Sequence, residues 1–378
     1  MNPTDVRALT RGNNVFALDL HRQLRKADGN LFFSPFSIST ALAMTCAGAR
    51  RETESQMARV LRFEQTDESL HAAFAVLQAR LAKAETQGGI QLKVANSLWP
   101  QKGYLFLAEF VALIQTHYGV IITPVDYRDT GNARQIVNAW VEEKTEKKIT
   151  GLIPPGVFNA LTRLTLVNAI YFKGNWADKF DPKMTRRGDF WSPQGKVYAS
   201  MMSRTDEYNY AETGSVQILE LPYMANALSM LIMLPREKDG WAELEEQLTP
   251  AYLEQAAAKL RQQQVFVSLP KFKAEAAFQL NEALIEMGMT DAFDVNRANF
   301  AGMDGNEKGL FISAALHKAF IDVNEEGSEA AAATAVVMQF RGAPLKQPPA
   351  FRADHPFLFF IRENETGSIL FMGRLLKP

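Results

Sequence analysis

The residue types that most often carry out catalysis are sparse in this sequence and form none of the common constellations. No His-Glu-x-x-His or Gly-x-Ser-x-Gly motif is present, so the zinc-protease and nucleophile-elbow patterns are missing. Residues 151–156 have the glycine spacing of a phosphate-binding loop, but Val157 stands at the lysine position and two prolines remove amide donors. We therefore expect no metal ion and no nucleotide cofactor, while a carboxylate pair that meets only in the fold stays open.

The single cysteine, Cys46, excludes an intramolecular disulfide and a cluster of thiolate metal ligands. It lies in the apolar run of residues 41–47. We expect its side chain to be a small buried hydrophobe rather than a reactive thiol.

The most unusual segment lies near the C-terminus, from Ser328 to Phe340. It contains one charge, no glycine and no proline, and it opens with a run of small side chains, Ala330, Ala331, Ala332 and Ala333. A helix is one interpretation, because alanine has the highest helix propensity and Ser328 can cap a helix. The pair Val336-Val337 instead favours a strand.

As a strand, this segment would place its only charge, Glu329, on one face and mainly small side chains on the other. Small side chains are what a strand needs if it must enter between two strands that are already packed together. The sequence therefore predicts an insertable segment that ends before Arg341 and a proline-rich stretch.

The elements around this segment are helical early in the chain and extended later. Apolar residues at helical spacing occur in residues 14–24, 37–49 and 70–84. Runs that are apolar on both faces occur at residues 164–172, 228–235, 265–270 and 357–361, which is typical of central strands in a covered sheet. No linker or repeat marks a domain boundary.

The composition excludes several classes of partner. The chain has 378 residues, 47% of them hydrophobic, and its 41 Lys and Arg against 42 Asp and Glu give a formal net charge of −1. We therefore expect no general attraction to nucleic acid or to an anionic membrane. No apolar run approaches the roughly 18 residues that a membrane span needs.

Several motifs together identify the chain as resembling the serpins, from about Asn13 to Pro378. In the order of the family they are Asn30–Ile38, Trp140–Thr145 with Lys148–Ile149, Leu166–Gly174 with Trp176, His317–Lys318, Glu325–Ser328 and Ala353–Phe357. The resemblance implies an α+β fold with three β-sheets and eight or nine helices. It also implies one serpin domain over residues 1–378, with an exposed reactive-centre loop at about residues 325–349.

The resemblance further implies an inhibitor of serine proteases rather than an enzyme. In this family a protease attacks the loop and forms an acyl-enzyme, after which the cleaved loop inserts as a new central strand and distorts the protease. In members of the family, the residue whose carbonyl is attacked lies fourteen residues after the hinge glycine, which is Gly327 in this chain. The reactive bond would then join Arg341 to Gly342, which suits a trypsin-like protease. If the count is shifted by one residue, the attacked carbonyl belongs to Phe340, which would suit a chymotrypsin-like target.

Other matches to the family predict supporting roles in opening the central sheet. The hinge would comprise Glu325, Glu326, Gly327 and Ser328, followed by Ala330, Ala331, Ala332 and Ala333. A hydrogen-bonding cluster beneath the sheet, the shutter, would contain Ser34, Ser37, Asn168 and His317. The breach, where insertion begins, would contain Trp176.

Partners and location follow from the same resemblance. We expect a covalent acyl complex with a trypsin-like protease, a monomer able to form loop–sheet polymers on heating, and no cofactor. Members of the family that bind heparin use a basic helix, and the corresponding stretch here, residues 70–84, carries only Arg80 and Lys83. We therefore expect no glycosaminoglycan cofactor. An extracellular or periplasmic location fits if a leader was removed, and a cytoplasmic one fits the absence of a signal peptide. A non-inhibitory chaperone or carrier and a hydrolase of unrelated fold are the alternatives.

Overall fold

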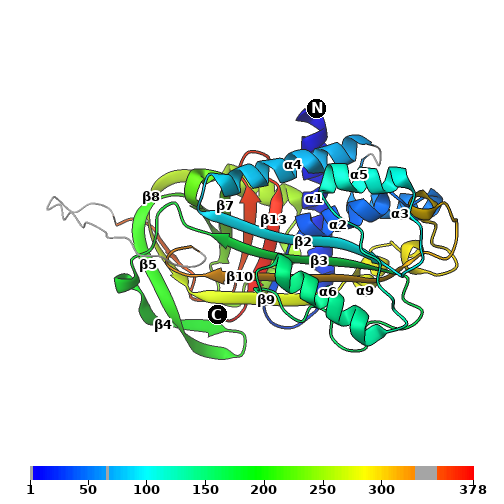
Figure 1. The fold of residues 1–378 in the computed structure, drawn as a ribbon. Helices are drawn as coiled ribbons and strands as arrows, with labels where there is room; N and C mark the ends of the chain where they lie inside the picture. Colours follow the sequence, from blue (N-terminus) through cyan, green and yellow to red (C-terminus); the bar gives the residue numbers. More distant parts are fainter. Residues whose placement is uncertain (1–2, 65–67, 328–346) are drawn as a thin grey trace.

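The computed structural model describes residues 3–64, 68–327 and 347–378 (Figure 1). The predicted reactive bond, Arg341–Gly342, and its rival residue Phe340 lie outside the described residues, and so do the hinge residues Ser328, Ala330, Ala331, Ala332 and Ala333. The other predicted site residues are described. In this part of the chain no helix is both long and apolar enough to cross a membrane.

A four-stranded sheet runs across the middle of the molecule (Figure 1). Its strands lie in the order β2 (Ile90–Pro100), β3 (Leu164–Gly174), β10 (Ile312–Val323) and β9 (Phe272–Gln279). The outer pairs are antiparallel, whereas the central pair, β3 and β10, is parallel. Almost every residue of β3 is buried, as its run of apolar residues predicted.

A second network of nine strands packs behind this sheet. Its members are β1 (Leu31–Phe33), β13 (Ile369–Leu375), β12 (Phe357–Glu363), β7 (Leu228–Pro235), β6 (Val216–Pro222), β5 (Gly195–Glu212), β8 (Arg261–Pro270), β11 (Ala350–Arg352) and β4 (Arg186–Ser192). The described strands thus form two networks rather than three separate sheets. The reason is that the long strand β5 pairs with β4 over its first residues, with β8 over its middle and with β6 at its end.

Ten α-helices are present in the described residues, against the eight or nine expected. They are α1 (Pro3–Leu24), α2 (Pro35–Cys46), α3 (Arg51–Leu61), α4 (Glu68–Thr86), α5 (Ala108–Tyr118), α6 (Thr130–Lys144), α7 (Trp241–Gln247), α8 (Pro250–Ala258), α9 (Asn281–Glu286) and α10 (Ala301–Asp304). The difference arises from α9 and α10, which have six and four residues. The helices predicted near residues 14–24, 37–49 and 70–84 correspond to α1, α2 and α4.

Helix α2 is buried along its whole length between the two sheets, because it packs against β2, β3 and β13. Its start is fixed by Ser34, whose side chain accepts a hydrogen bond from the Ser37 amide, and by Pro35 in the first turn. Cys46, in its last turn, is buried, and burial raises the pKa of its thiol to about 12. The prediction that Cys46 is buried in the core is confirmed.

Candidate functional site

The central pair of the four-stranded sheet is closed. Strands β3 and β10 are hydrogen-bonded directly to each other from the Leu164–Ile312 pair to the Phe172–Ile321 pair. Parallel pairs are slightly less stable per residue than antiparallel ones. The predicted insertion segment follows β10 after one short turn, so this pair is the place where it would enter.

That turn contains the hinge glycine. The amide of Asn324 donates to the Gly327 carbonyl at 2.8 Å, and the Gly327 amide donates back to the Asn324 carbonyl at 3.1 Å. Gly327 has φ +124°, and a Cβ atom there would lie 2.0 Å from the Gly174 carbonyl oxygen at the end of β3. Only glycine allows the chain to turn so close to β3.

Two carboxylates hold the hinge turn to its surroundings. Glu325 accepts hydrogen bonds from Lys271 at 2.8 Å and Thr185 at 2.7 Å, and Glu326 pairs with Lys179 at 2.5 Å. Burial opposes the charge of Glu325, but the bonds from Lys271 and Thr185 hold the pKa of its carboxyl below the usual range. Charged and hydroxyl groups from distant segments therefore hold the hinge carboxylates in place.

Trp176 lies against the hinge turn and donates to it twice. Its amide bonds the Glu326 carbonyl at 2.9 Å, and its indole Nε1 bonds the Asn324 carbonyl at 3.0 Å. The indole stacks on Tyr223, with ring centroids 4.7 Å apart and planes 10° apart. Trp176 is therefore the structural contact between the end of β3 and the start of the predicted loop.

Below the hinge, a row of polar side chains crosses three strands of the sheet. The row consists of Asn96 on β2, Asn168 on β3 and His317 on β10, which face one another in register. The Asn168 amide nitrogen donates to Asn96 and, at 2.5 Å, to Ser37, while the Asn168 oxygen bonds His317 Nδ1. The structure thus brings the predicted shutter residues Ser37, Asn168 and His317 together.

Ser34 completes this cluster from the start of α2. Its amide donates to His317 Nε2 at 3.1 Å, and its hydroxyl donates to the Leu370 carbonyl at 2.6 Å. Because Nε2 accepts, the imidazole proton must lie on Nδ1, which donates to Asn168. Complete burial favours this neutral form and lowers the pKa of His317 to about 3. The imidazole thus joins both central strands to the buried helix.

Sequence reasoning missed several contributors to these sites, and three of them are examples. Asn96 is a polar residue in the middle of a strand, which is a signal that could have identified it. Tyr223, the stacking partner of Trp176, and Lys271, which binds Glu325, follow strand ends and carry no such signal. Their roles depend on pairings between distant segments.

The far end of the predicted loop is also anchored. Strand β11 pairs in parallel with β8, and the Phe266 amide donates to the Pro349 carbonyl at 2.9 Å. Both ends of the predicted loop therefore join fixed strands. Among the described residues no group of three His, Cys, Asp or Glu side chains could hold a metal ion.

Comparisons with known proteins agree with this arrangement. The family described as "Serpin (serine protease inhibitor)" matches residues 11–378. Human Serpin B3 is 40% identical, with 98% of this chain and 100% of that protein covered. Human leukocyte elastase inhibitor is 42% identical, with 98% of this chain and 99% of that protein covered.

Solved structures support the fold. Uncleaved ovalbumin superposes with a TM-score of 0.88 at 29% identity, covering 98% of this chain and 100% of that chain. Serpin48 of the insect Tenebrio molitor gives a TM-score of 0.88 at 32% identity, covering 100% and 99%. These findings confirm the resemblance and the α+β fold that the motifs predicted.

Proposed function

We propose that this chain, which belongs to the serpin family, inhibits trypsin-like serine proteases as a suicide substrate that is cleaved after Arg341. Inhibition of proteases in general follows from the family and from relatives such as leukocyte elastase inhibitor. The trypsin-like target, the acyl complex and the insertion step are our proposals for this chain.

The observation that carries the proposal is the direct parallel pairing of β3 and β10 beside the hinge. A segment that enters between them from Gly327 must run antiparallel to β10, and therefore antiparallel to β3 as well. Insertion would replace one parallel ladder by two antiparallel ladders, which are the more stable kind. The closed pair is thus the less favourable of the two arrangements that the same sheet can adopt.

The segment has the length that this change requires. The thirteen residues from Ser328 to Phe340 would extend about 43 Å at roughly 3.3 Å per residue, while β10 has twelve residues and β3 has eleven. Insertion would add one ladder of backbone hydrogen bonds to the sheet. At about 1 kcal/mol for each hydrogen bond, this ladder would stabilise the inserted form by on the order of 10 kcal/mol. In our proposal this energy deforms the catalytic loop of the tethered protease.

The chemistry begins as ordinary proteolysis. The protease serine Oγ would attack the Arg341 carbonyl carbon, the bond to the Gly342 nitrogen would break, and that nitrogen would leave as an amine with the proton that the histidine took from the serine. Arg341 would remain as an ester on the serine. Release of the new Gly342 terminus frees the segment, and insertion before water hydrolyses the ester would trap the protease.

The identity of the target rests on Arg341, whose guanidinium suits a specificity pocket that ends in a carboxylate. The test mixes the intact protein with trypsin and looks for a complex that survives boiling in SDS. We expect a band at the sum of the two masses less the C-terminal fragment of residues 342–378, and no such band when the trypsin serine has been blocked beforehand. Failure to form such a band, with the loop nevertheless cleaved after Arg341, would favour the non-inhibitory alternative.

Two variants at the same position separate the target class from the mechanism. Arg341→Lys should retain the trypsin complex, because the same pocket accepts both cations, whereas Arg341→Glu should lose it. A chymotrypsin complex formed at Phe340 in place of the trypsin complex would shift the register by one residue. Arg352→Gln, a matched charge change on the exposed face of β11, should leave inhibition unchanged.

A further inference from the structure

The hairpin formed by β4 and the start of β5 has an edge that faces away from the rest of the sheet. Among the described strands β4 pairs only with β5, from the Arg186–Met201 pair to the Ser192–Gly195 pair. The hairpin lies at the outer edge of the molecule (Figure 1). An edge strand presents backbone N–H and C=O groups to which another chain can pair.

Alternate residues of β4 direct their backbone groups to this open edge. In an antiparallel pair, the N–H and C=O groups of a residue point either to the partner strand or away from it, and the two cases alternate along the strand. Trp191 is of the second kind, because its amide donates to the Asp354 carbonyl, outside the hairpin, at 2.8 Å. Asp189 and Arg187 lie two and four residues earlier, so their backbone groups face the same edge. No described residue bonds them there.

The exposed face of the hairpin carries cations that are held against aromatic rings. The Arg187 guanidinium lies 3.8 Å from the centre of the Tyr198 ring. Lys238 Nζ, from the loop after β7, lies 3.7 Å from the centre of the Trp191 ring. Lys196 Nζ lies 5.8 Å and 5.7 Å from the centres of these two rings. The rings are exposed, yet they fix three charges over the hairpin before any partner binds.

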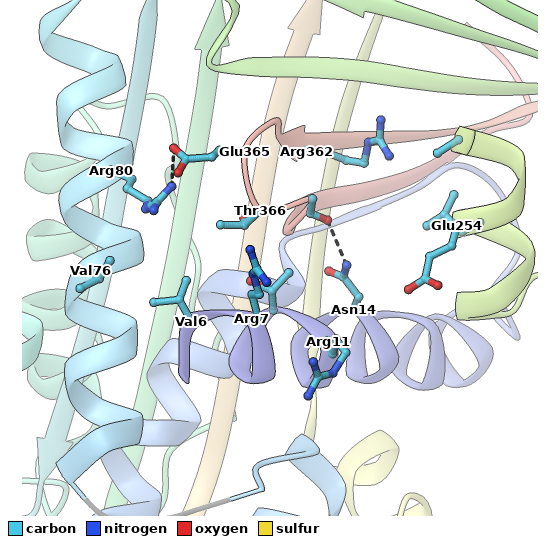
Figure 2. A pocket seen from close by; sticks show the side chains of 14 residues that line it. Val6, Arg7, Arg11, Asn14, Val76, Arg80, Glu254, Arg362, Glu365 and Thr366 are labelled. Atoms are coloured by element: carbon cyan, nitrogen blue, oxygen red, sulfur yellow. Dashed lines mark hydrogen bonds and ion pairs between the residues drawn. The ribbon is translucent and has the colours of Figure 1, made fainter. Parts of the chain in front are cut away.

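Two of these cations lack the carboxylate partner that neutralises arginines elsewhere. In the cavity of about 780 Å³ between α1, α4, α8 and the turn that joins β12 to β13, for example, Arg80 is paired with a carboxylate of that turn at 2.5 Å (Figure 2). Within the described chain, Arg187 and Lys238 make no ion pair, while Lys196 pairs with Asp189 at 3.2 Å. The face thus carries three cations against one carboxylate and attracts negative charge.

We propose that the open edge of β4 binds an extended acidic segment of a partner protein as an added strand. The backbone groups of Arg187 and Asp189 would pair with the segment, and its carboxylates would meet Arg187 and Lys196. Arginine, tyrosine and tryptophan are enriched at protein interfaces, which distinguishes this edge from one that charge merely protects. The acidic side chains would gather at the Arg187 end, because two carboxylates of the loop after β7 flank Lys238.

The same contacts argue against other negatively charged partners. Bases of a single-stranded nucleic acid stack on open aromatic rings, and here both rings already carry a cation on one face. A densely charged polysaccharide would meet the carboxylate of Asp189 in the middle of the surface. A peptide strand can place its carboxylates on either side of Asp189, because the side chains on one of its faces recur every two residues.

Fluorescence anisotropy tests the site, with a labelled peptide of sequence Thr-Glu-Thr-Glu-Thr-Glu-Thr and the intact protein. We expect saturable binding with a dissociation constant below about 1 mM, and no binding when lysine replaces glutamate in the peptide. Arg187→Gln and Lys196→Gln should each weaken binding about twofold to fivefold, and Asp189→Asn should strengthen it about twofold. All three side chains are exposed, so these changes should not affect the fold.

Methylation of the peptide backbone separates an added strand from a purely electrostatic contact. The amides of alternate residues face one edge of a strand, so N-methyl groups on the glutamates block one edge and N-methyl groups on the threonines block the other. One of these two peptides should bind as the parent does, and the other should bind about tenfold more weakly or not at all. Binding of both with the affinity of the parent would show that no strand is added, and the proposal would be wrong.

Lys308→Gln provides the matched control, because Lys308 is an exposed lysine in the loop before β10 and makes no ion pair in the described chain. It should leave binding unchanged. The proposal is also wrong if the unmodified peptide does not bind, or if Lys308→Gln weakens binding as much as Lys196→Gln does. Displacement of the labelled peptide by heparin at a lower concentration than by unlabelled peptide would likewise overturn it, since the surface would then select charge density alone.

Discussion

Acidification should weaken the closed sheet through His317. The folded protein holds the imidazole neutral, with Nε2 accepting the Ser34 amide and burial lowering the pKa from 6.5 to about 3. The unfolded chain therefore binds one more proton than the folded chain between these two values. Stability contributed by the neutral imidazole is complete above pH 6.5 and is lost as the pH falls toward 3.

The size of the effect follows from the same shift. Each pH unit below 6.5 lowers the free energy of unfolding by about 1.4 kcal/mol. The free energy of unfolding therefore falls by about 2 kcal/mol at pH 5 and by roughly 5 kcal/mol at most. The unfolding entropy of a chain of 378 residues is about 0.8 kcal/mol/K. A loss of 2 kcal/mol should therefore lower the apparent melting temperature by roughly 2–3 °C between pH 7 and pH 5.

The assay compares melting of the intact protein with that of His317→Gln at fixed scan rate across this pH range. A glutamine side-chain oxygen can still accept the Ser34 amide, but the side chain does not titrate. His21 is buried beside Glu245 and Arg374, and its pKa is also lowered, so it adds the same trend to both proteins. The difference between the two proteins isolates His317, and identical pH dependence in both would refute the reasoning.

Two further predictions concern the hinge and the sheet. Gly327→Ala should destabilise the intact form by about 1–3 kcal/mol, because the alanine Cβ would clash with the Gly174 carbonyl oxygen and the φ angle of residue 327 is positive. Urea unfolding measures this loss, and an unchanged midpoint would mean that the turn is formed differently. Mild heating should produce loop–sheet polymers, since an opened β3–β10 pair can accept another molecule's loop. Size-exclusion chromatography would detect them, and a sample that remains monomeric until it unfolds would count against this account.

Much of the fold could be predicted from the sequence, because long apolar runs determine it locally. Strands β3, β7 and β12 were visible as runs that are apolar on both faces, and α2 was visible from its Ser34-Pro35 start. The number of separate sheets could not be predicted from the sequence. It depends on β5 pairing with three different strands, β4, β8 and β6, and these pairings form only in the folded chain.

The site residues were predicted from the motifs that resemble the family rather than from their chemistry alone. A polar Asn168 within an apolar strand and a glycine before a run of alanines are visible in the sequence. The partners that give these residues their geometry are not, because Asn96, Tyr223 and Lys271 are brought to the site by pairings across the sheet. Whether Glu325 is exposed or paired likewise depends on Lys271, a residue 54 positions away.

The central claim is that the closed β3–β10 pair is a trapped state, and cleavage of the loop tests it most directly. The intact protein is melted before and after limited trypsin digestion, with mass spectrometry confirming the cut between Arg341 and Gly342. A gain on the order of 10 kcal/mol should raise the melting temperature by more than 10 °C. Nicking an ordinary loop leaves stability equal or lower, so an unchanged or lowered melting temperature would contradict insertion.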